Sequence, residues 1–132
     1  MRKLILIIAV IISFTSCDNF KESEAIEHIT RTWTVYKYEV DGYDQTPLFV
    51  ATYGTYTLVC EKDQDYTETY TVGATPVTIT GIYIFSDGDN ILTLSDEFQS
   101  RVFNVLTLTN NEMTLEDRNA DTNQVYYLEA VI

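Results

Sequence analysis

Positive charge is scarce in this chain, which has 8 Lys and Arg residues against 20 Asp and Glu residues. The formal net charge is therefore −12. Proteins that bind nucleic acids gather Lys and Arg against the phosphates, so this deficit argues against a nucleic-acid partner. The same acidity predicts that the folded body is repelled by anionic lipid headgroups.

Cysteine and histidine are almost absent as well, with 2 Cys and 1 His in 132 residues. This leaves too few side chains for a Cys/His metal cluster or for a nucleophile paired with a histidine base. The chain contains no glycine motif for phosphates or dinucleotides. Its acidic segment 87–90 (DGDN) lacks the spacing and the terminal Glu of a calcium loop. We therefore expect a protein that is not an enzyme and that holds no cofactor or metal.

An uninterrupted apolar run covers residues 4–12 and follows Arg2 and Lys3. A transmembrane helix needs about 20 residues, so the basic start and short run predict a secretory signal peptide. Residues 13–17 (SFTSC) resemble the lipobox of bacterial lipoproteins, in which small residues precede a Cys that is lipidated and becomes the mature N-terminus. Phe14 stands where that motif prefers Leu. The alternative is an ordinary signal peptide followed by a chance Cys.

We expect a lipoprotein signal peptide over residues 1–16, lipidation at Cys17, and a polar tether with a short helix over residues 17–31. This arrangement predicts attachment to a membrane through Cys17 and a place in the cell envelope, at the outer membrane or the cell surface. Cys60 then has no disulfide partner. Its apolar surroundings in the sequence predict a buried side chain.

From Thr32 onward the chain is rich in Thr, Tyr, Val and Ile, with Gly, Asn and Asp at the breaks. These are strand formers and turn formers respectively. No helical pattern separates the apolar segments, so the connections should be short and the sheet antiparallel. The expected fold is an all-β, eight-stranded antiparallel up-and-down barrel that forms one domain over residues 32–132. The predicted strands cover residues 32–40, 50–60, 66–72, 77–86, 91–95, 101–109, 112–117 and 124–131.

The connections predict two different barrel ends. In an up-and-down barrel the odd-numbered connections emerge at one end, and here they form the longer set. The even-numbered connections include tight turns at residues 87–90 and 110–111, which tolerate positive φ. One end should therefore be open and the other closed. Gly81, inside the fourth strand, predicts a bulge or bend at which the alternation changes phase.

Several short segments resemble the lipocalin-like family of bacterial lipoproteins. Thr32 and Trp33, preceded by Arg31 in place of a Gly, resemble the Gly-x-Trp motif of that family's first strand. The resemblance implies an eight-stranded cup, which in some members of the family holds an apolar molecule. The further matching segments are residues 54–58, 81–84, 90–94, 105–117 and 126–128.

Tyrosine is abundant, with 10 Tyr residues against 6 Phe. A Tyr side chain combines an apolar ring with a polar tip, which suits the wall of a ligand cavity. The alternative is an interior filled by side chains. Tyr36 and Tyr38 are expected to face outward. The candidates for inward, ligand-contacting positions are Tyr56, Tyr66, Tyr70 and Tyr83.

The expected open end contributes three further ligand-contacting candidates: Tyr43 and Phe49 in the first connection, and Phe98 in the loop 95–100. These side chains either cover a ligand or fold inward as a plug. Trp33, the only Trp, is expected to fill the floor of the barrel at the closed end. Glu68 shares a face with two of the Tyr candidates. We expect it to be exposed, and if it is buried it needs a partner such as Arg101.

The sequence thus predicts a membrane-anchored envelope lipoprotein with a lipocalin-like barrel that binds a small apolar or amphipathic ligand and acts as a monomer. The alternative is a non-enzymatic interaction or structural module whose filled barrel contacts an envelope protein or a glycan.

Overall fold

The structure, a computed structural model, describes residues 24–132. The predicted signal peptide and residues 17–23 of the predicted tether, Cys17 included, lie outside the described residues. In the described part of the chain, no helix is both long and apolar enough to span a membrane. The elements are α2 (Glu24–Ile29), β1 (Thr32–Val40), β2 (Tyr43–Asp44), α3 (Thr46–Tyr53), β3 (Thr57–Cys60), β4 (Asp65–Val72), β5 (Thr75–Ser86), β6 (Ile91–Asp96), β7 (Ser100–Leu108), β8 (Glu112–Asp117) and β9 (Gln124–Ala130).

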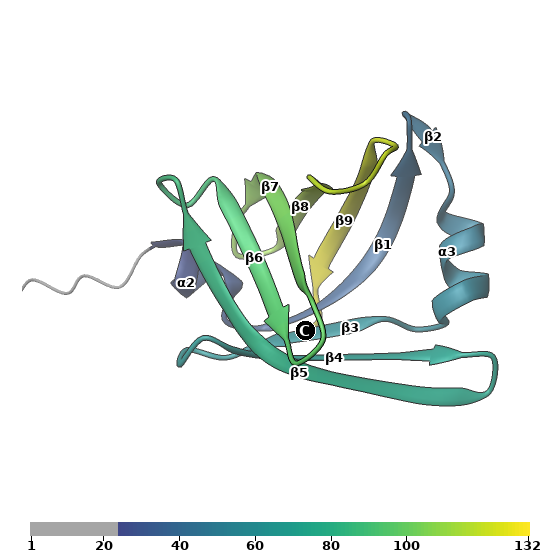
Figure 1. Cartoon of the computed structure of the whole chain (residues 1–132), viewed down its shortest axis with the longest axis horizontal. Helices are drawn as coiled ribbons and strands as arrows, with labels where there is room; N and C mark the ends of the chain where they lie inside the picture. The colour runs from purple at the N-terminus through teal and green to yellow at the C-terminus, as the bar shows by residue number, and fades with distance from the viewer. Residues whose placement is uncertain (1–23) are drawn as a thin grey trace, which may run out of the picture.

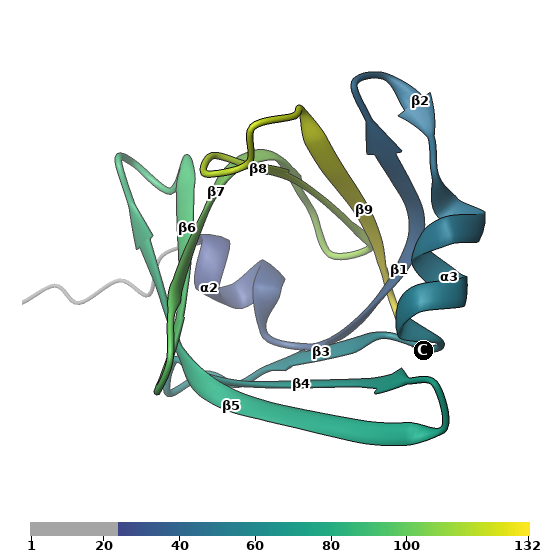
Figure 2. The same ribbon diagram turned by 45° about the vertical axis from the view of Figure 1, so that its right-hand side comes forward.

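The strands close into a barrel (Figure 2). From β3 onward each strand pairs antiparallel with the next, and β1 pairs with both β3 and β9. The two-residue β2 pairs only with the end of β1, so eight strands form the closed wall in residues 24–132. Closure removes the exposed sheet edges that a flat meander would leave. The predicted fold class, an eight-stranded antiparallel up-and-down barrel after a short helix, is confirmed.

The predicted strand over residues 50–60 is wrong in its first part, because residues 46–53 form the helix α3. Pro47 stands at the first turn of this helix, where its fixed φ favours helical geometry. The Asp44 carboxylate accepts a hydrogen bond from the backbone N–H of Thr46 at 2.9 Å. Gly54 ends the helix with a φ of 61°. The strand resumes only at Thr57.

A bulge in β1 decides which Tyr faces the interior. Val35 pairs with Leu128 but Lys37 pairs with Tyr127, so the register shifts at Tyr36. Tyr36 points outward and is 43% exposed, as predicted. Tyr38 faces inward and stacks on Tyr126, with ring centroids 4.9 Å apart. The prediction of an outward Tyr38 is therefore wrong, because the extra residue reverses the alternation after it.

The alternation of β5 does not change phase at Gly81, contrary to the prediction. Ile79, Tyr83 and Phe85 all face the core or the cavity. Gly81 is instead a point of close approach between β5 and β6, since a Cβ there would lie 2.1 Å from the carbonyl oxygen of Ser95. Only Gly fits at this position.

The even-numbered connections, residues 61–64, 87–90 and 109–111, gather at the closed end together with α2 (Figure 1). Ile29 of α2 and Trp33 of β1 are both fully buried there. The indole N–H of Trp33 donates to the carbonyl oxygen of Ile29 at 2.9 Å. On the surface of this end, the side chains of His28 and Arg31 bond to Asn110. The short helix thus forms part of the barrel floor.

The odd-numbered connections lie at the opposite end, and their length is concentrated in one of them. Residues 41–56 carry β2 and α3, whereas the connection from β4 to β5 is only residues 73–74. Figure 2 shows α3 beside β1 at the rim of the ring. A helix, rather than a set of long loops, therefore covers part of the open end.

Candidate functional site

A cavity of about 250 Å³ lies inside the barrel toward the end that carries α3. Its wall is built from the inner faces of the strands and from one side of α3. Apolar side chains form most of this wall, because alternate residues of each half-buried strand face the interior. The lining residues are Val35, Phe49, Tyr53, Tyr56, Leu58, Glu68, Tyr70, Ile79, Leu94, Gln99, Arg101, Phe103, Leu115, Asp117, Tyr126 and Leu128.

Aromatic rings form one continuous part of the cavity wall, centred on Phe49 of α3. The Phe49 ring lies 4.9 Å from Tyr53, 6.0 Å from Tyr56 and 6.2 Å from Tyr126, measured between centroids. These distances are in the range at which aromatic pairs attract one another. Phe49 is the buried residue of α3, so the same side chain anchors the helix and shapes the cavity.

A buried ion pair crosses the interior between β4 and β7. Both nitrogens at the end of the Arg101 guanidinium donate to the Glu68 carboxylate, with Nη1 3.2 Å from Oε2. The hydroxyl of Tyr56 donates to the same Oε2. The Glu68 side chain is 1% exposed and that of Arg101 is 27% exposed. The expectation of an exposed Glu68 is wrong, and the alternative, burial with Arg101 as its partner, is the one that the structure shows.

This cluster fixes the protonation of the groups around it. Burial and the neighbouring Glu68 carboxylate raise the pKa of Tyr56 well above its ordinary value. Burial lowers the pKa of Arg101, but the hydrogen bond and charge of Glu68 outweigh it, so the pKa is raised overall. Burial also raises the pKa of Tyr126. The phenols therefore stay neutral and the guanidinium stays charged. Such fixed protonation states suit the binding of a ligand, and they do not create a nucleophile.

Cys60 is 2% exposed, which confirms the predicted buried side chain. Burial raises the pKa of its thiol to about 12, and the charge of Glu68 contributes. A thiol with such a pKa is protonated at neutral pH and is a poor nucleophile. Cys60 is therefore a small apolar residue of the core.

The structure brings three of the seven predicted ligand-contacting residues to the cavity, namely Tyr56, Tyr70 and Phe49. Tyr66 and Tyr83 face inward and are almost fully buried, but they lie in the packed core and do not line the cavity. The other two are on the surface: Tyr43 is 73% exposed and Phe98 is 89% exposed. These two side chains neither line the cavity nor fold inward as a plug.

The cavity lining includes polar and aromatic residues that were not among the predicted site residues, and Tyr53, Asp117 and Tyr126 are three of them. Tyr126 shares the parity of Leu128 in β9, so alternation in that strand contained the signal. Tyr53 was missed because its segment was assigned to a strand. Asp117, at the last position of β8, shares the parity of the buried Met113 and Leu115, so alternation in that strand contained the signal as well.

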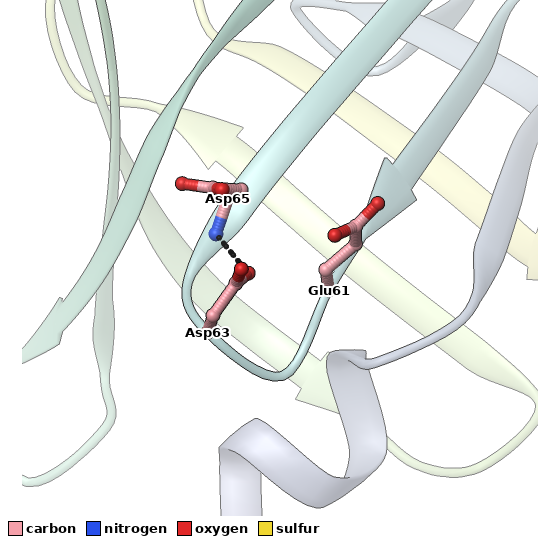
Figure 3. Close-up of side chains that lie close together, drawn as sticks. All are labelled: Glu61, Asp63 and Asp65. Atoms are coloured by element: carbon pink, nitrogen blue, oxygen red, sulfur yellow. Dashed lines mark hydrogen bonds between the residues drawn. The ribbon is translucent and has the colours of Figure 1, made fainter.

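The turn between β3 and β4 gathers three exposed carboxylates that the sequence analysis did not single out (Figure 3). Oxygens of Glu61, Asp63 and Asp65 all lie within 4.8 Å of one another. Oδ1 of Asp63 accepts a hydrogen bond from the backbone N–H of Asp65 at 3.1 Å. This bond is typical of Asp in tight turns, so the turn itself accounts for the placement of Asp63.

Comparison with known proteins bears on the fold alone. No family model matches the chain, and no curated protein sequence matches it. Among solved structures, a deswapped triple mutant of the bovine odorant-binding protein superposes with a TM-score of 0.52 at 11% sequence identity. The match covers 80% of this chain and 75% of that one. That neighbour is a lipocalin. The fold is lipocalin-like.

Proposed function

We propose that this protein is a membrane-anchored lipoprotein of the cell envelope whose lipocalin-like barrel binds a small apolar or amphipathic molecule. The cavity at the α3 end is the observation that carries the binding role. Its wall is mostly apolar and aromatic with a few fixed polar groups, which is the usual make-up of a small-molecule site. The lipocalin-like architecture fits the same role, because an eight-stranded barrel is wide enough to hold one small ligand.

The alternative role, an interaction module with a filled barrel, finds less support. A filled barrel would leave few voids larger than a water molecule, whereas the space between α3 and the strands measures about 250 Å³. Typical ligand pockets are of about 300 Å³ or more. The proposed ligand is therefore small.

The binding role predicts that filling the cavity abolishes binding. Ile79 of β5 lines the cavity, and Ile82 of the same strand points outward and is 48% exposed. We expect calorimetric titration of the wild-type protein with 1-octanol and 2-phenylethanol to show binding. The variant Ile79→Trp should bind at least about tenfold more weakly, since the indole occupies the ligand's space.

The variant Ile82→Trp is the matched control and should bind like the wild-type protein. Circular dichroism of both variants shows whether the barrel is retained. The binding role is refuted if the wild-type protein binds neither alcohol, or if the two Trp variants behave alike while both are folded.

The proposed anchor is carried by the sequence alone, through the resemblance of residues 13–17 to a lipobox. Acyl chains contribute about 0.8 kcal/mol for each buried CH₂ group, so several chains hold a protein at a membrane stably. The full chain expressed in a bacterium should enter the detergent phase on Triton X-114 partitioning. It should also incorporate radiolabelled palmitate, whereas the variant Cys17→Ala, which has no thiol to acylate at this position, should not.

The second cysteine provides the control for this experiment. Cys60 lies in the core, so Cys60→Ala should leave the partitioning and the palmitate labelling unchanged. Equal palmitate labelling of Cys17→Ala and the wild-type protein would contradict lipidation at Cys17 and leave the binding role untouched.

A further inference from the structure

The charged groups of the cavity do not balance. Its lining contains two carboxylates, Glu68 and Asp117, and one cation, Arg101. Arg101 is already engaged by Glu68 through both terminal nitrogens. Asp117 accepts a hydrogen bond from the backbone N–H of Asn119 at 2.8 Å. Among residues 24–132, no Lys, Arg or His side chain forms a salt bridge with Asp117.

Two further cationic side chains, Arg118 and Lys37, do not line the cavity. Arg118, which follows Asp117, is exposed. Lys37 of β1 lies over the ring of Tyr127, 5.0 Å from its centroid, and pairs with Glu39 at 3.7 Å. Neither residue lines the cavity. The interior therefore presents one negative charge that the described part of the protein does not neutralise.

The aromatic wall favours a cationic ligand, as the unpaired carboxylate does. Six rings line the cavity, and the face of each ring carries the negative part of its quadrupole. An ammonium group over such faces is attracted by about 0.5–2 kcal/mol per contact. An anion in the same place is repelled by the ring faces. The rings are those of Phe49, Tyr53, Tyr56, Tyr70, Phe103 and Tyr126.

The net charge of the whole protein also favours a cationic ligand. With a net charge of −12, the protein attracts cations toward its surface and its openings and repels anions. A fatty-acid carboxylate would have to enter against this field, and in the cavity it would compete with Glu68 for Arg101.

We propose that the cavity takes a small amphipathic amine, with an apolar or aromatic body among the rings and one protonated amino group paired with Asp117. This inference rests on the proposed function and names its ligand class. A molecule of this class neutralises the unpaired carboxylate without disturbing the Glu68–Arg101 pair. Charge-assisted hydrogen bonds of this kind are about twice as strong as neutral ones.

The test uses probes that share a body and differ in their charge. The purified full chain is titrated calorimetrically with 2-phenylethylamine, 2-phenylethanol and 3-phenylpropionate at pH 7, and then with octylamine, 1-octanol and octanoate. In both series we expect the amine to bind at least about tenfold more tightly than the alcohol, and the carboxylate to bind most weakly.

The role of Asp117 is tested by Asp117→Asn, which keeps the acceptor for Asn119. This variant should bind the amines about tenfold more weakly and the alcohols unchanged. Its matched control is Glu112→Gln, which removes one charge from the exposed, opposite end of the same strand and should keep the wild-type preference.

Three results would overturn the inference. If the carboxylates bind as tightly as the amines, the ligand class is wrong while the binding role stands. If Asp117→Asn and Glu112→Gln bind the amines equally, Asp117 is not the partner of the amino group. If no member of either series binds, both the ligand class and the proposed binding role fail.

Discussion

Replacing Trp33 by Ala is expected to lower the free energy of unfolding by about 4 kcal/mol. Trp33 is fully buried and lies between the strands and α2. Its removal leaves a large cavity in the barrel floor, and it takes away the N–H that bonds the carbonyl oxygen of Ile29. Small domains have total stabilities of about 5–15 kcal/mol, so this variant is close to unfolding. Urea titration followed by circular dichroism measures the effect.

Two further variants separate the packing of Trp33 from its hydrogen bond. Trp33→Phe keeps most of the ring but leaves the Ile29 carbonyl without its donor, which should cost about 1–3 kcal/mol and speed amide exchange in α2. Phe98→Ala removes an aromatic ring that is 89% exposed, so it should change the stability by less than about 0.5 kcal/mol. A loss for Trp33→Ala as small as that for Phe98→Ala would contradict the role of Trp33 in the floor.

Replacing Arg101 by Met is expected to lower the free energy of unfolding by about 3 kcal/mol, because it leaves the Glu68 carboxylate buried without its cation. The double variant Glu68→Leu/Arg101→Met should regain most of this loss. In that variant both charged groups are replaced by apolar groups of similar size, and such replacements are often neutral or stabilising. Measuring Glu68→Leu as well completes a double-mutant cycle by urea titration.

The surface pair of Lys37 and Glu39 is the control for the buried pair. Its side chains are 41% and 19% exposed, and exposed pairs contribute about 0–1 kcal/mol. Lys37→Met should therefore cost less than about 1 kcal/mol. If Arg101→Met costs no more than Lys37→Met, or if the double variant is less stable than both single variants, the buried pair does not have the energetic role argued for it.

The contrast between the two pairs shows how far the site could be read from the sequence. Glu68 shares the inward parity of Tyr66 and Tyr70, which marked it as a candidate for burial. Burying a carboxylate without a partner is costly, and no residue adjacent to Glu68 in the sequence supplies a positive charge to pair with it. That charge comes from Arg101 on β7, and two strands lie between β7 and β4 in the sheet. Only barrel closure brings these side chains together.

The helix α3 also depends on contacts that form only in the folded barrel. Residues 48–50 are apolar in succession and fit a buried strand as well as a short helix. The helix is selected by Pro47, by the bond from Thr46 to Asp44, and by the space in which Phe49 packs edge-on against the stacked rings of Tyr38 and Tyr126. That space exists only after β1 and β9 have paired.

The sequence by itself determined the fold class, the number of wall strands and the burial of residues such as Trp33 and Cys60. It could do so because side-chain alternation and turn chemistry are local properties that can be recognised in the sequence of one chain. The tertiary structure decided the bulge at Tyr36, the direction of Tyr38, and the pairing of Glu68 with Arg101. These depend on register between strands that are distant in sequence, and one extra residue in one strand reverses every side chain that follows it.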